Sequence, residues 1–105
     1  MRLSTPYGTV TVLFRDALAG RIAGSRGACV LRRDEIRVAG DSISAFALAH
    51  EMHHVFKARS LGWRYLPWVL IQYAKSLNHD ATPFEQEAEA WAALHVGEFS
   101  DVWAA

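Results

Sequence analysis

The feature that most constrains the fold of this 105-residue chain is a long run without glycine or proline. The run covers residues 43–61, follows the turn-forming sequence Gly40-Asp41-Ser42 and ends at Gly62. Asp and Ser are favoured at helix N-caps, and glycine tolerates the positive φ with which many helices end. Apolar residues recur in the run at steps of three and four, the spacing of one helix face. The sequence therefore predicts a capped helix over residues 43–61, buried on more than one side.

The residues before this helix indicate a small β-sheet. Residues 8–15 are rich in β-branched side chains and predict a strand. Residues 28–32 and 35–38 predict two strands with Arg33-Asp34 as the connecting turn, although one longer strand is an alternative. Residues 17–27 contain three glycines and fit either a short helical turn followed by a loop or a turn between strands.

Two more helices are expected after Gly62. Residues 63–77 are largely apolar, with Pro67 near the first turn of a helix. Thr82-Pro83-Phe84-Glu85 then supplies a cap, a proline and an acidic residue for a last helix, which should run to about Val96 and end at Gly97. The length suits one domain, residues 1–105, and the order of elements predicts an α+β fold in which a small N-terminal sheet is followed by three helices.

The helix over residues 43–61 carries His50-Glu51-Met52-His53-His54, which fits the pattern H-E-x-x-H. A spacing of four places His50 and His54 on one helix face, where they can bind one Zn²⁺. A bound zinc ion lowers the pKa of water to about 7, and a neighbouring carboxylate can take its proton. Glu51 is the candidate for that general base. The alternative is a chance match in which both histidines are ordinary helix residues without a metal.

A catalytic zinc usually takes three protein ligands, and the sequence Glu85-Gln86-Glu87-Ala88-Glu89 lies some thirty residues downstream. With the H-E-x-x-H helix, this segment resembles the gluzincin metallopeptidases, in particular the minigluzincins and the catalytic core of prenyl-protein endopeptidase relatives. The resemblance covers residues 35–97. It implies a minimal zincin-like domain in which Glu85 is the third zinc ligand. It also implies that Glu89 supports a zinc-bound histidine, although the family has Asp at that position.

Residues other than Glu85 are also candidates for the third zinc ligand. Thr82-x-x-Glu85 is also a capping box, in which the Glu85 carboxylate would accept a hydrogen bond from the backbone N–H of Thr82. In that case Glu87 becomes the alternative ligand, with His79 and no third protein ligand as the remaining options. His79 is also a candidate oxyanion donor, as are Tyr65 and Tyr73.

Several other residues invite simpler interpretations. His53 should point away from the metal face and be partly exposed, and Cys29 is expected to be a small buried residue rather than a ligand or a latency thiol. We expect core packing to explain the aromatic residues Trp63, Tyr65, Trp68 and Tyr73 better than a substrate cleft or a membrane surface. Trp91 and His95, one turn apart, should face the same core or its rim.

Charge and composition limit the classes of partner and the location that the sequence predicts. Residues 1–37 carry seven arginines against three acids, whereas residues 76–105 carry six acids and no Lys or Arg. The net charge is zero and no nucleic-acid-binding motif accompanies the arginines, so we expect no nucleic-acid partner. No signal peptide is recognisable and the most apolar run, residues 66–74, is too short to span a bilayer. These features predict a cytoplasmic protein without a membrane span.

The function expected from these features is zinc-dependent hydrolysis of peptide bonds in a peptide or protein substrate. The strand over residues 35–38 would be the edge to which an extended peptide adds. The alternative is a catalytically inactive zincin-like module that serves as a structural or protein-interaction domain.

Overall fold

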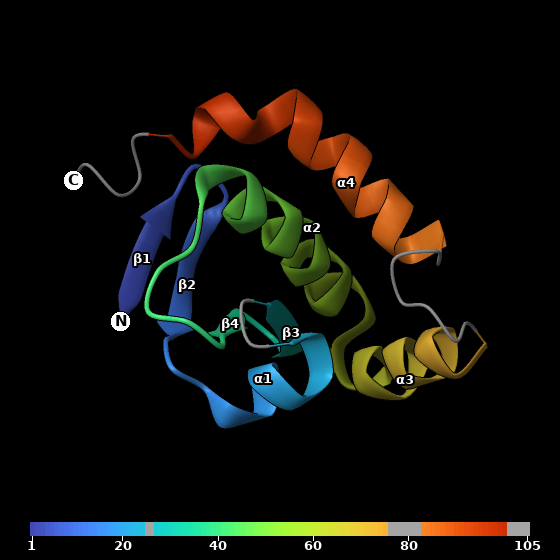
Figure 1. Cartoon of the computed structure of the whole chain (residues 1–105). Helices are drawn as coiled ribbons and strands as arrows, with labels where there is room; N and C mark the ends of the chain where they lie inside the picture. The colour runs from blue at the N-terminus through green and yellow to red at the C-terminus, as the bar shows by residue number, and fades with distance from the viewer. Residues whose placement is uncertain (25–26, 76–82, 101–105) are drawn as a thin grey trace.

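The computed structural model describes residues 1–24, 27–75 and 83–100 (Figure 1). In chain order its elements are β1 (Arg2–Thr5), β2 (Gly8–Leu13), α1 (Ala17–Ala23), β3 (Ala28–Arg32), β4 (Glu35–Val38), α2 (Ala45–Leu61), the 3₁₀ turn η1 (Gly62–Arg64), α3 (Tyr65–Lys75), α4 (Pro83–His95) and the 3₁₀ turn η3 (Val96–Glu98). The α+β fold is confirmed: a four-stranded sheet is followed by the three helices α2, α3 and α4. Helix α1 shows that residues 17–23 form the short helix of the first alternative.

The strand order of the sheet is β1-β2-β4-β3. β1 pairs with β2 and β3 pairs with β4 in antiparallel fashion, whereas β2 and β4 are parallel. The predicted hairpin is confirmed, and its turn contains Asp34 at φ 57°, a conformation that Asp tolerates better than most residues. The expectation that β4 offers an edge to a peptide is wrong, because β4 is an interior strand with a neighbour on each side.

Helix α2 begins later than the turn-forming residues suggested. Its N-cap is Ser44, whose Oγ accepts a hydrogen bond from the Ala47 backbone N–H at 3.1 Å. Ser42 is therefore not the cap and lies in the preceding loop. Gly62 ends the helix as predicted, with a positive φ of 60° and its N–H donating to the Ala58 carbonyl. The chain continues through the single turn η1 directly into α3.

The hydrophobic core lies between the sheet and α2, and α4 packs against α2 (Figure 1). The strands contribute alternate side chains such as Val10, Val12 and Ile36, and the helix contributes Leu48 and Met52, all of which are buried. α2 is thus enclosed by the sheet and by α4, which explains why apolar residues occupy more than one of its sides. This enclosure places His50 and His54 where α4 can meet them.

The opposite face of the sheet carries a network of charged side chains. Arg37 on β4 lies 2.9 Å from the Asp16 carboxylate and 3.1 Å from the Glu35 carboxylate. Asp16 also caps α1 by accepting a hydrogen bond from the Ala19 N–H at 3.0 Å. This charged network connects α1 to the sheet and fixes its position beside β3 and β4.

The aromatic residues divide between core and surface. Tyr65 is buried and Trp68 is half-buried, as core packing requires, but Trp63 is 81% exposed and contradicts that expectation. The side chain of Tyr73 lies outside the described part of the structure. Trp91 and His95 stack on each other with ring centroids 4.2 Å apart, and Trp91 packs against the core as predicted. No helix in the described ranges is long and apolar enough to cross a bilayer.

Candidate metal centre

Three potential ligands converge where α2 meets the first turn of α4. His50 and His54 lie one turn apart on α2, with ring centroids 4.9 Å apart. Glu85 reaches both: one carboxylate oxygen lies 2.8 Å from His50 Nε2 and the other 3.1 Å from His54 Nε2. One donor atom from each residue lies within 4.8 Å of the other two. This spacing is close enough for the three side chains to hold a single metal ion.

The geometry distinguishes the two candidate carboxylates. Glu85 is 4% exposed and faces the histidines, whereas Glu87 is exposed and lies beside His53 and Lys57. Two residues along a helix correspond to a rotation of about 200°, so the two carboxylates cannot share a face. Thr82 lies outside the described residues, so the rival capping box is not observed. Both carboxylate oxygens of Glu85 contact the histidines, so Glu85 and not Glu87 is the carboxylate placed to act as the third ligand.

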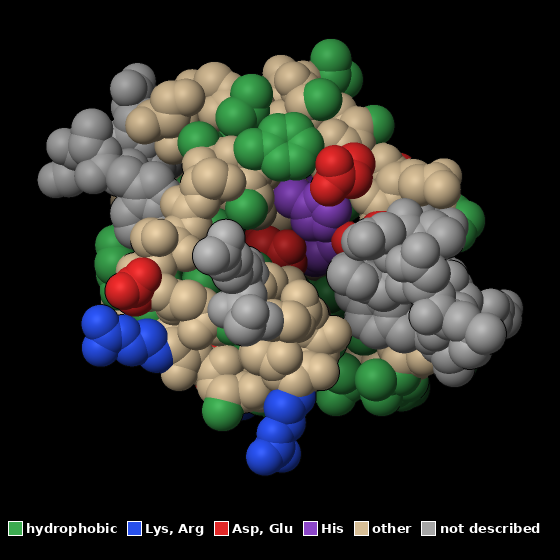
Figure 2. Space-filling view, viewed as in Figure 1, with side chains coloured by type: hydrophobic (Ala, Val, Ile, Leu, Met, Phe, Trp, Pro, Cys, Tyr) green, Lys and Arg blue, Asp and Glu red, His purple; other side chains and the backbone are tan. Residues whose placement is uncertain are grey.

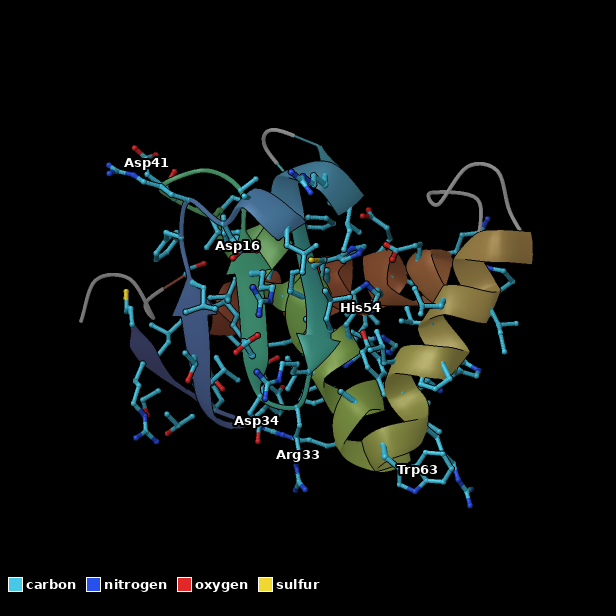
Figure 3. All side chains as sticks on the ribbon, turned by 90° about the horizontal axis from the view of Figure 1, so that it is seen from below. Asp16, Arg33, Asp34, Asp41, His54 and Trp63 are labelled. Atoms are coloured by element: carbon cyan, nitrogen blue, oxygen red, sulfur yellow. The ribbon has the colours of Figure 1, made fainter. Side chains whose placement is uncertain are left out.

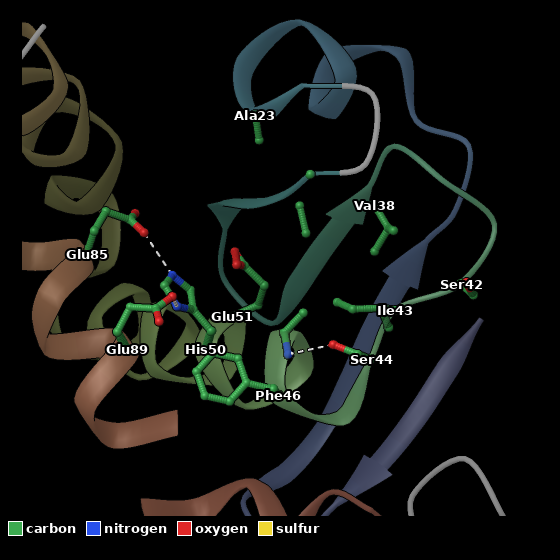
Figure 4. Close-up of a pocket in the computed structure, with 13 residues that line it drawn as sticks. Ala23, Val38, Ser42, Ile43, Ser44, Phe46, His50, Glu51, Glu85 and Glu89 are labelled. Carbon is green, nitrogen blue, oxygen red and sulfur yellow. Dashed lines mark hydrogen bonds and ion pairs between the residues drawn. The ribbon is translucent and has the colours of Figure 1, made fainter. Parts of the chain in front are cut away.

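Glu89 contacts the first histidine from its other side. Its Oε1 lies 2.9 Å from His50 Nδ1, the ring nitrogen that faces away from Glu85 (Figure 4). A carboxylate on the outer nitrogen of a metal-binding histidine fixes the orientation and tautomer of the ring. The extra methylene relative to Asp therefore does not prevent the contact, although the Glu89 side chain is 59% exposed.

The charges of the three groups are interdependent. Burial opposes ionisation of Glu85, but hydrogen bonds from His50 and His54 outweigh it and hold its pKa well below the usual range. Burial lowers the pKa of His54, whereas at His50 the effect of burial is overcome by Glu85 and the pKa rises. A metal ion requires neutral imidazoles, so metal binding must displace a proton from His50 over part of the acidic range.

Glu51 is the most unusual group near these residues. Its side chain is 5% exposed, and burial raises its pKa to about 8. Its Oε1 has no hydrogen-bond partner among the described residues. A buried carboxylate oxygen without a partner costs stability, so such a group points to a binding or catalytic role.

A cavity of about 320 Å³ opens at this place, and the acidic and histidine side chains are visible at its floor (Figure 2). His50, Glu51, Glu85 and Glu89 line one side of it (Figure 4). Glu51 therefore shares a solvent-accessible space with two of the three potential ligands, His50 and Glu85. The candidate metal-binding group therefore adjoins a cavity that is open to solvent.

No family model, curated protein or solved structure matches this chain. The case for a metal centre therefore rests on the chemistry of the chain's own residues.

The other predicted residues lie elsewhere. His79 lies outside the described residues. Tyr65 donates its hydroxyl to the Val30 carbonyl at 2.7 Å in the interior, so it is engaged there instead of serving the cavity. His53 is half-buried and faces Trp91, with ring centroids 6.1 Å apart, on the side away from the metal centre. Cys29 is buried and does not belong to the ligand group.

The sequence did not reveal the walls of the cavity. They are formed by small and apolar residues of three separate segments: Ala23, Gly27, Ala28, Val38, Ile43, Phe46 and Ala47. Phe46 lies one turn before His50 and could have been found from that spacing. The contribution of α1 could not, because nothing in its composition distinguishes a cavity wall from an ordinary surface helix.

Proposed function

We propose that this protein is a zinc-dependent metallopeptidase. The observation that carries the proposal is the buried Glu51 carboxylate, whose Oε1 has no hydrogen-bond partner among the described residues, beside a His50, His54 and Glu85 group of ligand spacing. Two imidazoles and one carboxylate are a ligand set of catalytic zinc, which keeps a fourth position for water. The resemblance of the two helical motifs to gluzincins supports the same reaction.

Zinc bound there would lower the pKa of a water molecule and polarise the carbonyl of a peptide bond. Glu51 is the residue that accepts the proton of the attacking water and passes it to the leaving amine. A carboxyl group whose pKa is raised by burial is suited to holding that proton between the two steps. Glu89 also lines the cavity, but its carboxylate contacts Nδ1 of His50, so it is a positioning residue for that ring.

The substrate would be an extended peptide lying in the cavity beside β3. β3 is the edge strand on this side of the sheet, and its first residue, Ala28, lines the cavity. The Tyr65 hydroxyl already occupies the Val30 carbonyl, so main-chain pairing with a peptide is confined to the part of β3 before Val30. A short pairing segment favours a peptide or an unfolded chain over a folded protein as substrate.

The test is the Glu51→Gln variant, measured against a library of fluorogenic peptides with zinc-loaded protein. We expect the variant to keep its zinc and to lose at least about 100-fold in cleavage rate, since a general base contributes roughly that much. Glu87→Gln is the matched control and should cleave as the wild type does, because Glu87 lies outside the cavity.

Full activity of Glu51→Gln would contradict the assignment of the base. A wild-type protein that holds zinc, melts at a lower temperature after chelation and cleaves no peptide of the library would instead be an inactive zincin-like structural module.

A further inference from the structure

The outer side of η1 and α3 is an exposed apolar surface. We call it the α3 face and define it by its five residues: Trp63, Leu66, Pro67, Leu70 and Ile71. Trp63 is 81% exposed, and Leu66, Leu70 and Ile71 are 41%, 55% and 52% exposed. Hydrophobic side chains gather in Figure 2 at the lower right, where Figure 1 places α3.

The residues of this surface follow helical spacing, because Trp63, Leu66 and Leu70 lie three and four positions apart. Tyr65 and Val69 occupy the other side of the helix and are buried in the core. α3 therefore has two apolar sides, of which only one is used within the described fold. Single exposed leucines are normal, but a continuous row that includes a tryptophan marks a contact surface.

Arginines border the α3 face. Arg32 and Arg33, at the end of β3, line a hollow of about 390 Å³ together with Trp63 and Leu66. Figure 3 shows Arg33 and Trp63 projecting from the same edge of the molecule. The guanidinium carbon of Arg64 lies 5.5 Å from the Trp63 ring centroid.

Negative charge is scarce at this border. Residues 56–75 contain no Asp or Glu. The nearby acid Asp34 is bound by Arg59, with Nε and Oδ1 2.6 Å apart, and lies within 3.8 Å of Arg33. The α3 face thus combines an apolar centre with a positively charged rim.

We propose that the α3 face docks on the surface of a membrane that contains anionic phospholipids. Trp and Leu side chains partition into the boundary between headgroups and acyl chains, and arginines bind the phosphate groups above it. α3 has 11 residues and is about 17 Å long, so it would lie in the plane of the interface and not across the bilayer.

The rim argues against a second copy of the chain as the occupant. A twofold dimer through this surface would place the arginines of each copy against the α3 face of the other, which contains no acid to compensate them. An anionic lipid surface satisfies the same arginines. The charge pattern therefore selects the membrane over self-association.

The test is flotation of the full chain with lipid vesicles. We expect binding to vesicles of phosphatidylcholine mixed with one third phosphatidylglycerol, little binding to phosphatidylcholine alone, and weakening at high salt. The double variant Trp63→Ser/Leu70→Ser should bind at least about tenfold more weakly, because it removes two inserting side chains. Leu94→Ser is the matched control: Leu94 is 83% exposed on α4, away from this surface, and its loss should leave binding unchanged.

Melting curves by circular dichroism establish that all variants are folded. We expect them to fold, because the substituted side chains are exposed. The proposal is overturned if the wild type binds neither kind of vesicle, or if Leu94→Ser weakens binding as much as the double variant. It is also overturned if light scattering shows a wild-type dimer that the double variant dissociates, because a second copy would then cover the α3 face.

Discussion

At the residue scale, the chemistry of the centre depends on which carboxylate touches which histidine nitrogen. His50 lies between two acids, with Glu85 at Nε2 and Glu89 at Nδ1. The H-E-x-x-H spacing predicted that His50 and His54 share a face, and the structure places them so. The choice between Glu85 and Glu87 could not be made from spacing alone, because it depends on the rotation of α4 against α2.

The contact of Glu89 with His50 predicts an effect on metal affinity. Glu89→Ala should weaken zinc binding about tenfold, since outer carboxylates orient metal-binding histidines. Glu87→Ala removes the same charge from the same helix without touching the centre and should leave the affinity unchanged. Competition with a fluorescent zinc chelator measures both, and equal affinities of the two variants would show that Glu89 does not position His50.

Cys29 gives a prediction that depends on pH. Burial, with the negative charge of Glu51, raises its thiol pKa from 9.0 to about 11. At pH 8 the folded protein should therefore react with iodoacetamide at least about 100-fold more slowly than the urea-unfolded chain, because only the thiolate reacts.

The pH profile separates this cause from steric hindrance alone. The rate of the folded protein should keep rising up to about pH 11, whereas the rate of the unfolded chain should level off above about pH 10, where its thiol is almost fully ionised. Parallel profiles, followed by mass spectrometry, would contradict the raised pKa.

At the element scale, α2 organises the molecule through side chains at both ends. Near its C-terminus the Arg59 guanidinium donates to the Tyr7 carbonyl in the β1–β2 turn and to Asp34 in the β3–β4 turn, both at 2.6 Å. One helix residue thereby connects both turns of the sheet to α2. Neither contact follows from sequence periodicity, because the partners are 52 and 25 residues away.

Arg59→Ala should lower the free energy of unfolding by about 2 kcal/mol, because it breaks two charge-assisted hydrogen bonds and leaves Asp34 with a weaker partner. Arg33→Ala is the control: its contact with the same Asp34 is longer, at 3.8 Å, and its side chain is 70% exposed. We expect less than about 0.5 kcal/mol from it. Urea unfolding of the metal-free proteins measures both, and equal losses would contradict the role of Arg59.

The helices and strands differ in how well the sequence predicted them. α2 and α4 were predicted to within a few residues because Gly62 ends the first and Pro83 begins the second, although the N-cap of α2 was placed too early. β1 was not predicted, since its pairing with β2 is a tertiary contact that the composition of residues 2–5 does not reveal. The order β2-β4-β3 makes β4 interior, and strand order depends on the crossover through α1, which the sequence left ambiguous.

At the scale of the whole molecule, the fold brings the two proposed functional surfaces to separate places. The cavity lies between α2, α4 and the β3 side of the sheet, and the α3 face lies beyond Gly62. The sequence predicted the candidate ligands and Glu51 of the first because these residues follow a recognised spacing, but not the walls of the cavity. It missed the second because exposure of Trp63 and Leu70 depends on which side of α3 the core covers, and apolar residues occur on both sides.

The most direct test of the account is the zinc content of the chain, measured by elemental analysis after dialysis against zinc and then buffer. We predict about one zinc per chain for the wild type and for Glu87→Ala, and loss of the metal from His54→Ala and Glu85→Ala. A wild-type protein without zinc, or a Glu85→Ala variant that retains as much zinc as Glu87→Ala, would contradict the His50, His54 and Glu85 centre.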